Sequence, residues 1–161
     1  MTMASFRLGI GADDIGAELK DYLFKSLVQD PRVSTVRDYS DDRTDPTSSY
    51  PVVAIRVAQA ISRSDIDRAI LVCGTGMGMS IAANKVIGIR AAVVHDGYAA
   101  ERSVLSNNCQ VMTLGSQIIA EVSALRLVTE WLGYTFDPSS PFAAKLQVIE
   151  DYESTLDRAR D

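Results

Sequence analysis

Short apolar runs alternate with longer amphipathic segments along most of the chain. The segment Arg68–Cys73 (RAILVC) contains an uninterrupted apolar run, which is typical of a strand buried on both faces of a parallel sheet. In Ile15–Val28, apolar residues recur at the spacing of an amphipathic helix. The two patterns predict strands at 6–11, 33–37, 68–73, 90–95 and 110–114. They predict helices at 15–28, 50–61, 80–86, 98–105, 120–132 and 143–159.

Strands that alternate with helices predict an α/β fold, with a five-stranded parallel sheet covered by helices on both faces. We expect a single domain over residues 1–161. Its final helix, within 143–161, follows a loop bounded by prolines, Asp137–Pro141, and we expect it to dock on a second subunit. In such sheets ligands bind outside the carboxyl ends of the strands. The pattern therefore predicts that a ligand binds near the segments that follow three of the strands: Asp13–Asp14, Cys73–Ser80 and His95–Asp96.

Composition narrows the classes of function. The 161 residues hold 16 Lys and Arg against 21 Asp and Glu, a net charge of −5 without a basic cluster, which argues against nucleic acid as a partner. No segment approaches the roughly 18 continuous apolar residues of a membrane span, and no secretory signal is recognisable, so we expect a cytoplasmic protein. Cys73, Cys109 and His95 are too few nitrogen and sulfur ligands for a zinc site, so we expect no metal.

The strongest local feature is a thiol followed by glycines, in the segment Cys73–Ser80 (CGTGMGMS). Glycines at alternate positions let backbone N–H groups converge on a ligand, and a helix start behind them adds partial positive charge. Such a loop can bind an anion and stabilise a developing oxyanion. It lacks the spacing of a Walker A loop and of the dinucleotide fingerprint. A cysteine at a strand end is more often a core residue, but the adjacent loop favours a functional Cys73.

Other candidate residues have a structural interpretation beside the functional one. Asp13 and Asp14 could bind sugar hydroxyls or transfer protons, or could cap the next helix, and Asp14 is the better capping candidate. His95 could be a general acid or base, although a strand-end histidine held by a hydrogen bond is the more common case. We interpret Cys109 as a core residue. Met77 and Met79 could line a pocket or simply pack the loop.

The segment from Cys73 to Arg90 resembles the signature of a known family. Cys73–Gly76 (CGTG), Ser80–Lys85 (SIAANK) and Gly88–Ala91 (GIRA) are similar to the type B ribose 5-phosphate isomerases, which share a family with the galactose 6-phosphate isomerase subunits. Tyr50–Pro51 and the segment Tyr98–Ala100 add to the resemblance. It runs from about Leu8 to about Ile149, most of the chain.

The resemblance implies a Rossmann-like fold, a homodimer or a dimer of dimers, and active sites built between subunits. It implies interconversion of aldose and ketose phosphates through a cis-enediolate, without metal or other cofactor. Cys73 would move the proton between C1 and C2, and Thr75 would assist transfer between the oxygens. Asp13 would contact substrate hydroxyls, and Asn107 would come from the neighbouring subunit. The predicted catalytic residues are Cys73, Thr75 and Asp13; the predicted substrate-binding residues are Asp14, Tyr50, Gly74, Gly76, Met77, Gly78, Met79, Ser106, Asn107 and Lys145.

The chain departs from the family pattern at several of these positions. Asp14 stands where the family usually has a histidine, and Ser106 stands where it has the histidine that opens the sugar ring. Gln117 replaces an arginine, and two further phosphate-binding arginines fall near Pro141 and Lys145. The resemblance therefore implies that ring opening lacks its usual catalyst and that the phosphate loses several cations. Lys145 and Arg43 are candidate replacements.

Three hypotheses follow for the function. The family resemblance suggests isomerisation of ribose 5-phosphate to ribulose 5-phosphate. The departures suggest a tetrose phosphate such as erythrulose 4-phosphate, because its phosphate occupies the hydroxyl that a furanose ring needs, so no ring has to be opened. The run Ser106–Asn108 is also similar to that of the erythrulose 4-phosphate members. In a different class, the chain could bind a sugar phosphate without catalysis.

Overall fold

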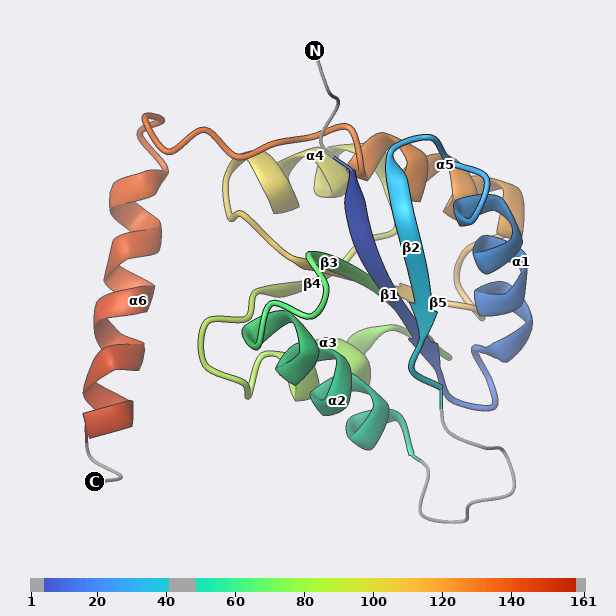
Figure 1. Ribbon diagram of the computed structural model, residues 1–161, viewed down its shortest axis with the longest axis horizontal. Helices are drawn as coiled ribbons and strands as arrows, with labels where there is room; N and C mark the ends of the chain where they lie inside the picture. Colours follow the sequence, from blue (N-terminus) through green and yellow to red (C-terminus); the bar gives the residue numbers. More distant parts are fainter. Residues whose placement is uncertain (1–4, 41–48, 159–161) are drawn as a thin grey trace.

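The computed structural model describes residues 5–40 and 49–158. In this part of the chain, five parallel strands form one sheet in the order β2-β1-β3-β5-β4. Helices α1, α4 and α5 pack on one face of the sheet, and α2 and α3 pack on the other (Figure 1). The strands are β1 (Phe6–Ala12), β2 (Val33–Asp38), β3 (Arg68–Cys73), β4 (Ala91–Val93) and β5 (Val111–Gly115), and the helices are α1 (Ala17–Leu27), α2 (Tyr50–Ser62), α3 (Met77–Ala83), α4 (Gly97–Leu105), α5 (Glu121–Trp131) and α6 (Ala143–Arg158). The predicted three-layer α/β fold is confirmed.

Strand β3 lies at the centre of the sheet, between β1 and β5, and all six of its residues are buried. Its side chains alternate between two hydrophobic clusters. Ile70 and Val72 belong to the cluster under α1, α4 and α5, whereas Leu71 and Cys73 belong to the cluster under α2 and α3. The apolar run at 68–73 is thus explained by burial on both faces, and the period of two places the Cys73 thiol on the side of α2 and α3.

Helix α3 begins earlier than the sequence pattern predicts. The predicted helix 80–86 is wrong in its bounds, because the loop after Cys73 closes within three residues and α3 starts at Met77. Gly76 has a φ of 78°, a left-handed conformation that glycine adopts without strain, and it turns the chain directly into the helix. The helix ends at Ala83, because the next side chain, Asn84, bonds to both backbone groups of Ala91 at 2.8 Å each.

Strand β4 is shorter than predicted, with three residues instead of Arg90–His95. It is an edge strand that pairs only with β5, so its ends have no second partner. At its start, the Arg90 N–H donates to the Gln110 side chain at 2.8 Å. At its end, the His95 ring accepts a hydrogen bond from the N–H of Gly115. Side chains thus add to the backbone bonds that join both ends of this strand to β5.

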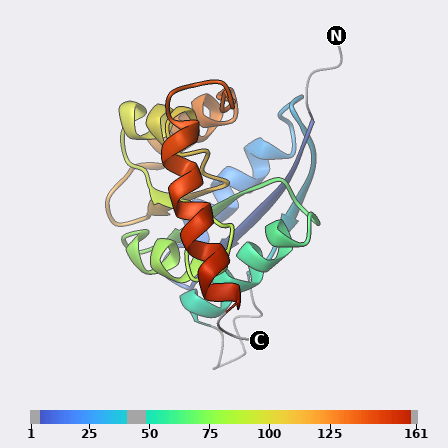
Figure 2. The ribbon, with the colours of Figure 1, turned by 90° about the vertical axis from the view of Figure 1, so that its left-hand side faces the viewer.

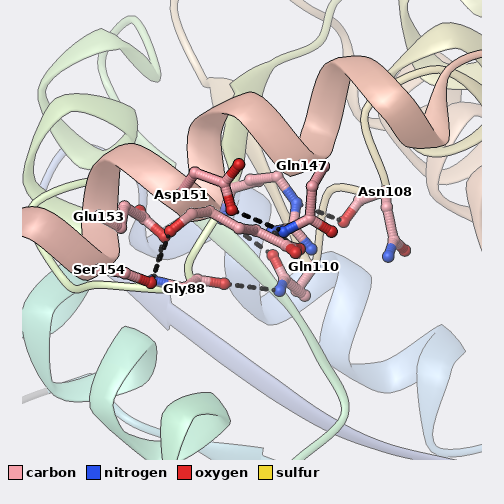
Figure 3. A network of polar contacts seen from close by, with 9 residues as sticks. Gly88, Asn108, Gln110, Gln147, Asp151, Glu153 and Ser154 are labelled. Carbon is pink, nitrogen blue, oxygen red and sulfur yellow. Dashed lines mark hydrogen bonds and ion pairs between the residues drawn. The ribbon is translucent and has the colours of Figure 1, made fainter.

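Helix α6 stands beside the body of the molecule, and Figure 2 shows it running across one side. Leu146 is its buried anchor, and the carboxylate of Glu153 accepts a hydrogen bond from Gly88 N–H at 3.0 Å. The Gln110 side chain donates in turn to the carbonyl of Gly88, so the polar network in Figure 3 links α6 to the residues before β4 and β5. Glu150 also faces the Arg90 guanidinium at 3.7 Å. Four large apolar side chains of α6 remain exposed: Val148, Ile149, Tyr152 and Leu156.

Within residues 5–40 and 49–158, the helices fall short of the length and apolar character that crossing a bilayer would demand.

Candidate active site

Three loops meet at the carboxyl edge of the sheet, after β1, β3 and β5. The amide of Ser116 donates to the carbonyl of Cys73 at 2.9 Å, and the amide of Gln117 donates to the carbonyl of Gly74 at 3.1 Å. The Ser116 hydroxyl donates to the carbonyl of Ile15 at 2.9 Å, which ties in the loop after β1. The loop that carries the cysteine is therefore held by backbone bonds to its neighbours.

The Cys73 sulfur lies against the backbone of its own loop. The Gly76 N–H donates to Sγ at 3.1 Å, and the Met77 N–H donates to the Thr75 hydroxyl oxygen at 3.3 Å. Cys73 is only 5% exposed, whereas Thr75 is exposed. The first amides of α3 follow at once, and the first turn of a helix leaves its N–H groups without intrahelical acceptors. A thiol, a hydroxyl and the first amides of α3 thus stand together, as proton transfer beside an oxyanion requires.

Glycines allow this close packing. A Cβ on Gly115 would lie 2.7 Å from Thr75 Cα and 2.9 Å from the carbonyl oxygen of Gly74, closer than real Cβ atoms approach. A Cβ on Gly78 would lie 2.4 Å from the Tyr50 ring, so this glycine makes room for Tyr50 at the start of α3. Tyr50 itself is 41% exposed at the first residue of α2. The structure thus places Tyr50 beside the cysteine loop, as the prediction of a shared site requires.

The two methionines of the predicted site differ in exposure. Met77 is 57% exposed at the first residue of α3. Met79 has no exposed surface and packs in the core under α2 and α3. Of the two alternatives for the Met79 side chain, a pocket lining or internal packing, the structure shows packing, and the backbone amide of Met79 stays the predicted ligand contact.

Neither of the two acidic residues after β1 caps α1, because the N-cap residue of this helix is Gly16 and has no side-chain capping bond. The Asp13 carboxylate accepts a hydrogen bond from Gly16 N–H at 2.9 Å, just before α1. The alternative that Asp13 or Asp14 caps the helix, with Asp14 as the better candidate, is therefore wrong, because a turn separates both residues from the first residue of α1. Asp14 is exposed, and Asp13 is partly exposed. Both carboxylates remain at the same edge of the sheet as Cys73.

The other predicted residues lie at the opposite edge. Ser106 and Asn107 follow the last turn of α4 and precede β5, whereas Cys73 pairs in the sheet with the last residue of β5, Gly115. A strand advances about 3.3 Å per residue, so the six residues of β3 alone separate the two edges by about 17 Å. Lys145 is exposed on the first turn of α6, with its ammonium over the Phe142 ring. One chain therefore does not bring these three residues to Cys73.

His95 is confirmed as a strand-end histidine held by a hydrogen bond. Its Nε2 accepts from the N–H of Gly115 at 2.8 Å, so the ring is neutral there. Burial lowers the pKa of His95, and the neighbouring Asp96 opposes the shift. Cys109 is buried in the core as expected, and burial raises the pKa of its thiol to about 11.

Two cavities adjoin the site on the far side of the 116–120 loop. One, of about 430 Å³, is lined by His95, Arg126 and Glu130 among others. The second, of about 680 Å³, lies between the start of α1 and the loop with Ser116 and Gln117. Neither has Cys73 in its lining. In the part of the chain that the structure describes, no group of three or more His, Cys, Asp or Glu side chains could hold a metal ion.

Sequence reasoning missed two residues that adjoin the predicted ones. Ser116 bonds to two of the three loops, and its signal is its place directly after the glycine that ends an apolar strand. Arg102 donates through Nη1 to the Ser106 hydroxyl at 3.4 Å, and nothing in the sequence marks it except the helical spacing of four. The Gln117 side chain lies against Gly74, where a Cβ would be 3.2 Å from its oxygen. Arg43 lies outside the described residues.

The fold and the cysteine loop define a class of enzyme. Residues 8–149 match the Ribose/Galactose Isomerase family, and the chain belongs to this family of sugar-phosphate isomerases. It is 48% identical over 149 residues to "D-erythrulose-4-phosphate isomerase 2" of Mycolicibacterium smegmatis, with 92% of this chain and 98% of that protein covered. It is 43% identical to the D-erythrulose-4-phosphate isomerase of Pectobacterium atrosepticum, with 91% and 94% covered. The structure of ribose-5-phosphate isomerase B from Clostridium thermocellum superimposes with a TM-score of 0.85 at 35% identity, covering 93% and 99%.

The packing of Gly115 gives a prediction for stability. We expect Gly115→Ala to destabilise the fold by about 1–3 kcal/mol, because the new methyl group collides with backbone rather than with a movable side chain. Gly97→Ala is the matched control, since its nearest contact would be the Glu130 carboxylate at an ordinary 3.6 Å. Thermal and urea unfolding of both variants measure the difference. Equal stability of the two variants would contradict the close approach at Gly115.

Proposed function

We propose that this chain interconverts a ketose and an aldose phosphate of four carbons, D-erythrulose 4-phosphate and D-erythrose 4-phosphate, with Cys73 as the base. The observation that carries the proposal is the cysteine loop itself. Cys73 Sγ, the Thr75 hydroxyl and the first amides of α3 occupy one short segment at the carboxyl edge of the sheet. A proton beside a carbonyl is hard to remove, so a placed base and a stabilised enediolate are what this reaction needs.

In the proposed reaction, the Cys73 thiolate removes a proton from C1 of the ketose. The electrons of the C–H bond form the C1–C2 double bond, and the carbonyl oxygen at C2 becomes an enediolate oxygen that the loop amides stabilise. Thr75 assists the movement of a proton from the oxygen at C1 to the oxygen at C2. The thiol then returns its proton to C2, which leaves an aldehyde at C1. No atom is gained or lost.

The substrate follows from the side chains that replace the family's charged ones. Ser106 has a hydroxyl where ring opening uses an imidazole, and a hydroxyl does not exchange protons at neutral pH as an imidazole does. A tetrose 4-phosphate cannot close a furanose ring, so it needs no such group. The two relatives with 48% and 43% identity act on erythrulose 4-phosphate by name. The tetrose alternative is therefore favoured over ribose 5-phosphate.

The proposed site needs a second copy of the chain. Ser106, Asn107 and Lys145 are expected substrate contacts, yet in one chain they lie at the edge of the sheet opposite Cys73. A twofold dimer can bring the two edges together, because each copy then offers its α4–β5 loop to the cysteine loop of the other. Asn107 is exposed, as a residue lent to a partner would be.

Replacement of the cysteine tests the chemistry. We expect Cys73→Ala to lower kcat for D-erythrulose 4-phosphate by roughly 10²- to 10⁴-fold, which is the usual contribution of a general base. The control is Cys109→Ala, since Cys109 is buried at the opposite edge of the sheet. A coupled assay with D-erythrulose 4-phosphate and D-ribose 5-phosphate side by side separates the two substrates.

Three results of that assay would contradict the proposal. If the Cys73→Ala variant still turns over the substrate, Cys73 is not the base. A higher kcat/KM for ribose 5-phosphate than for erythrulose 4-phosphate would identify the pentose phosphate as the preferred substrate. A rise in melting temperature with sugar phosphate but no turnover of either sugar would indicate a binding protein instead.

Mixed dimers test the shared site. We expect Cys73→Ala and Asn107→Ala each to be inactive as pure proteins, because each lacks one half of every site. When equal amounts of the two chains assemble together, half of the dimers are mixed, and each mixed dimer has one intact site. Activity should then return to about a quarter of the wild-type value. Recovery is measured after co-expression with two different affinity tags. If no activity returns although mixed dimers form, both residues belong to the site of a single chain.

A further inference from the structure

The imidazole of His95 holds the end of the strand that faces the cysteine loop. Its Nε2 accepts a hydrogen bond from the N–H of Gly115 at 2.8 Å. A backbone N–H only donates, so Nε2 must be unprotonated and the ring proton must sit on Nδ1. The bond therefore exists only while the imidazole is neutral.

Gly115 is the residue through which this bond reaches the proposed catalytic loop. It pairs with Cys73 in the sheet register, and its Cα lies so near Thr75 that a Cβ would come within 2.7 Å of Thr75 Cα. The next two amides, of Ser116 and Gln117, donate to the carbonyls of Cys73 and Gly74. A displacement of Gly115 thus moves the support of both the thiol and the hydroxyl.

We propose that His95 is a positioning residue for the isomerisation: in its neutral form it fixes Gly115 behind the Cys73–Thr75 loop, and its protonation releases that support. This inference rests on the proposed function, because it assigns the loop a catalytic task. His95 does not touch the substrate in this scheme. It acts through Gly115 on the placement of the base.

The surroundings of His95 let it titrate. It lines the cavity of about 430 Å³ together with two charged side chains, and a third charged group, its neighbour in the chain, acts on it electrostatically. Asp96 follows it in the chain, while Arg126 and Glu130 come from α5 and pair with each other at 3.0 Å. Burial outweighs Asp96 and holds the pKa of His95 below its ordinary value of 6.5. Its contribution to stability is therefore present above pH 6.5 and is lost as the pH falls toward the folded-state pKa.

Two amide substitutions separate the hydrogen bond from the charge. In His95→Gln, the Oε1 atom stands as many bonds from Cα as Nε2 does, so it can accept from Gly115 N–H at every pH. In His95→Asn the amide is one carbon shorter and the bond is lost. We expect His95→Gln to keep most of the kcat at pH 8 and His95→Asn to lose about 10- to 100-fold, mainly in kcat rather than KM.

The pH dependence of kcat/KM distinguishes a positioning role of His95 from a purely structural one. The thiol must lose a proton to act, so kcat/KM falls with acid in every active variant. In the wild type the protonation of His95 is a second protonation that lowers kcat/KM as the pH falls. Below the pKa of His95, the slope of log kcat/KM against pH should thus be steeper by one in the wild type than in His95→Gln. Equal slopes, or full activity of His95→Asn, would overturn the proposal.

Two controls exclude other causes. Ser103→Ala removes the bond from the Trp131 indole, 3.1 Å long and remote from the loop, so it lowers stability without lowering kcat. Glu130→Gln keeps the steep slope if His95, rather than Glu130, supplies the second proton. A slope that becomes shallow in Glu130→Gln would overturn the assignment to His95.

Nuclear magnetic resonance keeps this inference separate from the proposed function. We expect the Gly115 amide signal to move with pH at the titration of His95 in the wild type and to stay still in His95→Gln. If the chain has no isomerase activity although this signal titrates, the proposed function fails and the hydrogen-bond switch remains. If the signal does not titrate in an active enzyme, the switch fails and the proposed function remains.

Discussion

The carboxyl end of β5 is the constraint on which the rest of the site depends. Gly115 pairs with Cys73, abuts Thr75 without a side chain and donates its N–H to His95. A residue with a Cβ could keep the first and third of these contacts only by pushing the loop away. The position of the thiol is thus set by backbone packing within the central strands, which are the most rigid part of an α/β fold, and not by the loop's own conformational preference.

The same sheet geometry divides the predicted site between its two edges. In a parallel sheet every strand ends at one edge and every helix returns the chain to the other. The residues after β1 and β3, including Asp13 and Cys73, therefore gather at the carboxyl edge, and the residues after α4, including Asn107, gather at the amino edge. No adjustment of loops in one chain can remove this separation. Sugar-phosphate chemistry at Cys73 that uses Asn107 consequently requires a second copy.

Most of the fold could be predicted from the sequence, because apolar residues at buried positions recur with the period of the strand or helix that carries them. The run at 68–73 identified the central strand because β3 is buried on both faces, and the five strands and six helices were all found. The start of α3 was not predictable in the same way. It depends on the left-handed Gly76 and on the Tyr50 ring over Gly78, a contact between distant segments that local pattern does not reveal. For the same reason the sequence left open whether the Met79 side chain lines a pocket or packs, and only the structure places it in the core.

The site was predicted less completely than the fold, and His95 shows why. Its residue type and strand-end position suggested a satisfied histidine, but its partner lies 20 residues further on, and only the pairing of β4 with β5 brings the two together. Ser116 and Arg102 could not be recognised from the sequence either, because serine and arginine are common on protein surfaces. Tertiary contacts give these ordinary residues their roles.

Two features of the chain that share no residue lead to the same expectation of a second copy. The first is the split of the predicted site, which places Lys145 and Asn107, two of the expected substrate contacts, beyond the reach of Cys73. The second is α6, which is tied to its own body by Leu146 and by the Glu153–Gly88 bond while Val148 and Tyr152 stay exposed. Apolar side chains on a helix that already has an anchored side favour burial against another surface. Because α6 carries Lys145 on its first turn, a copy that covers this helix would be held close to the cation that the proposed site lacks.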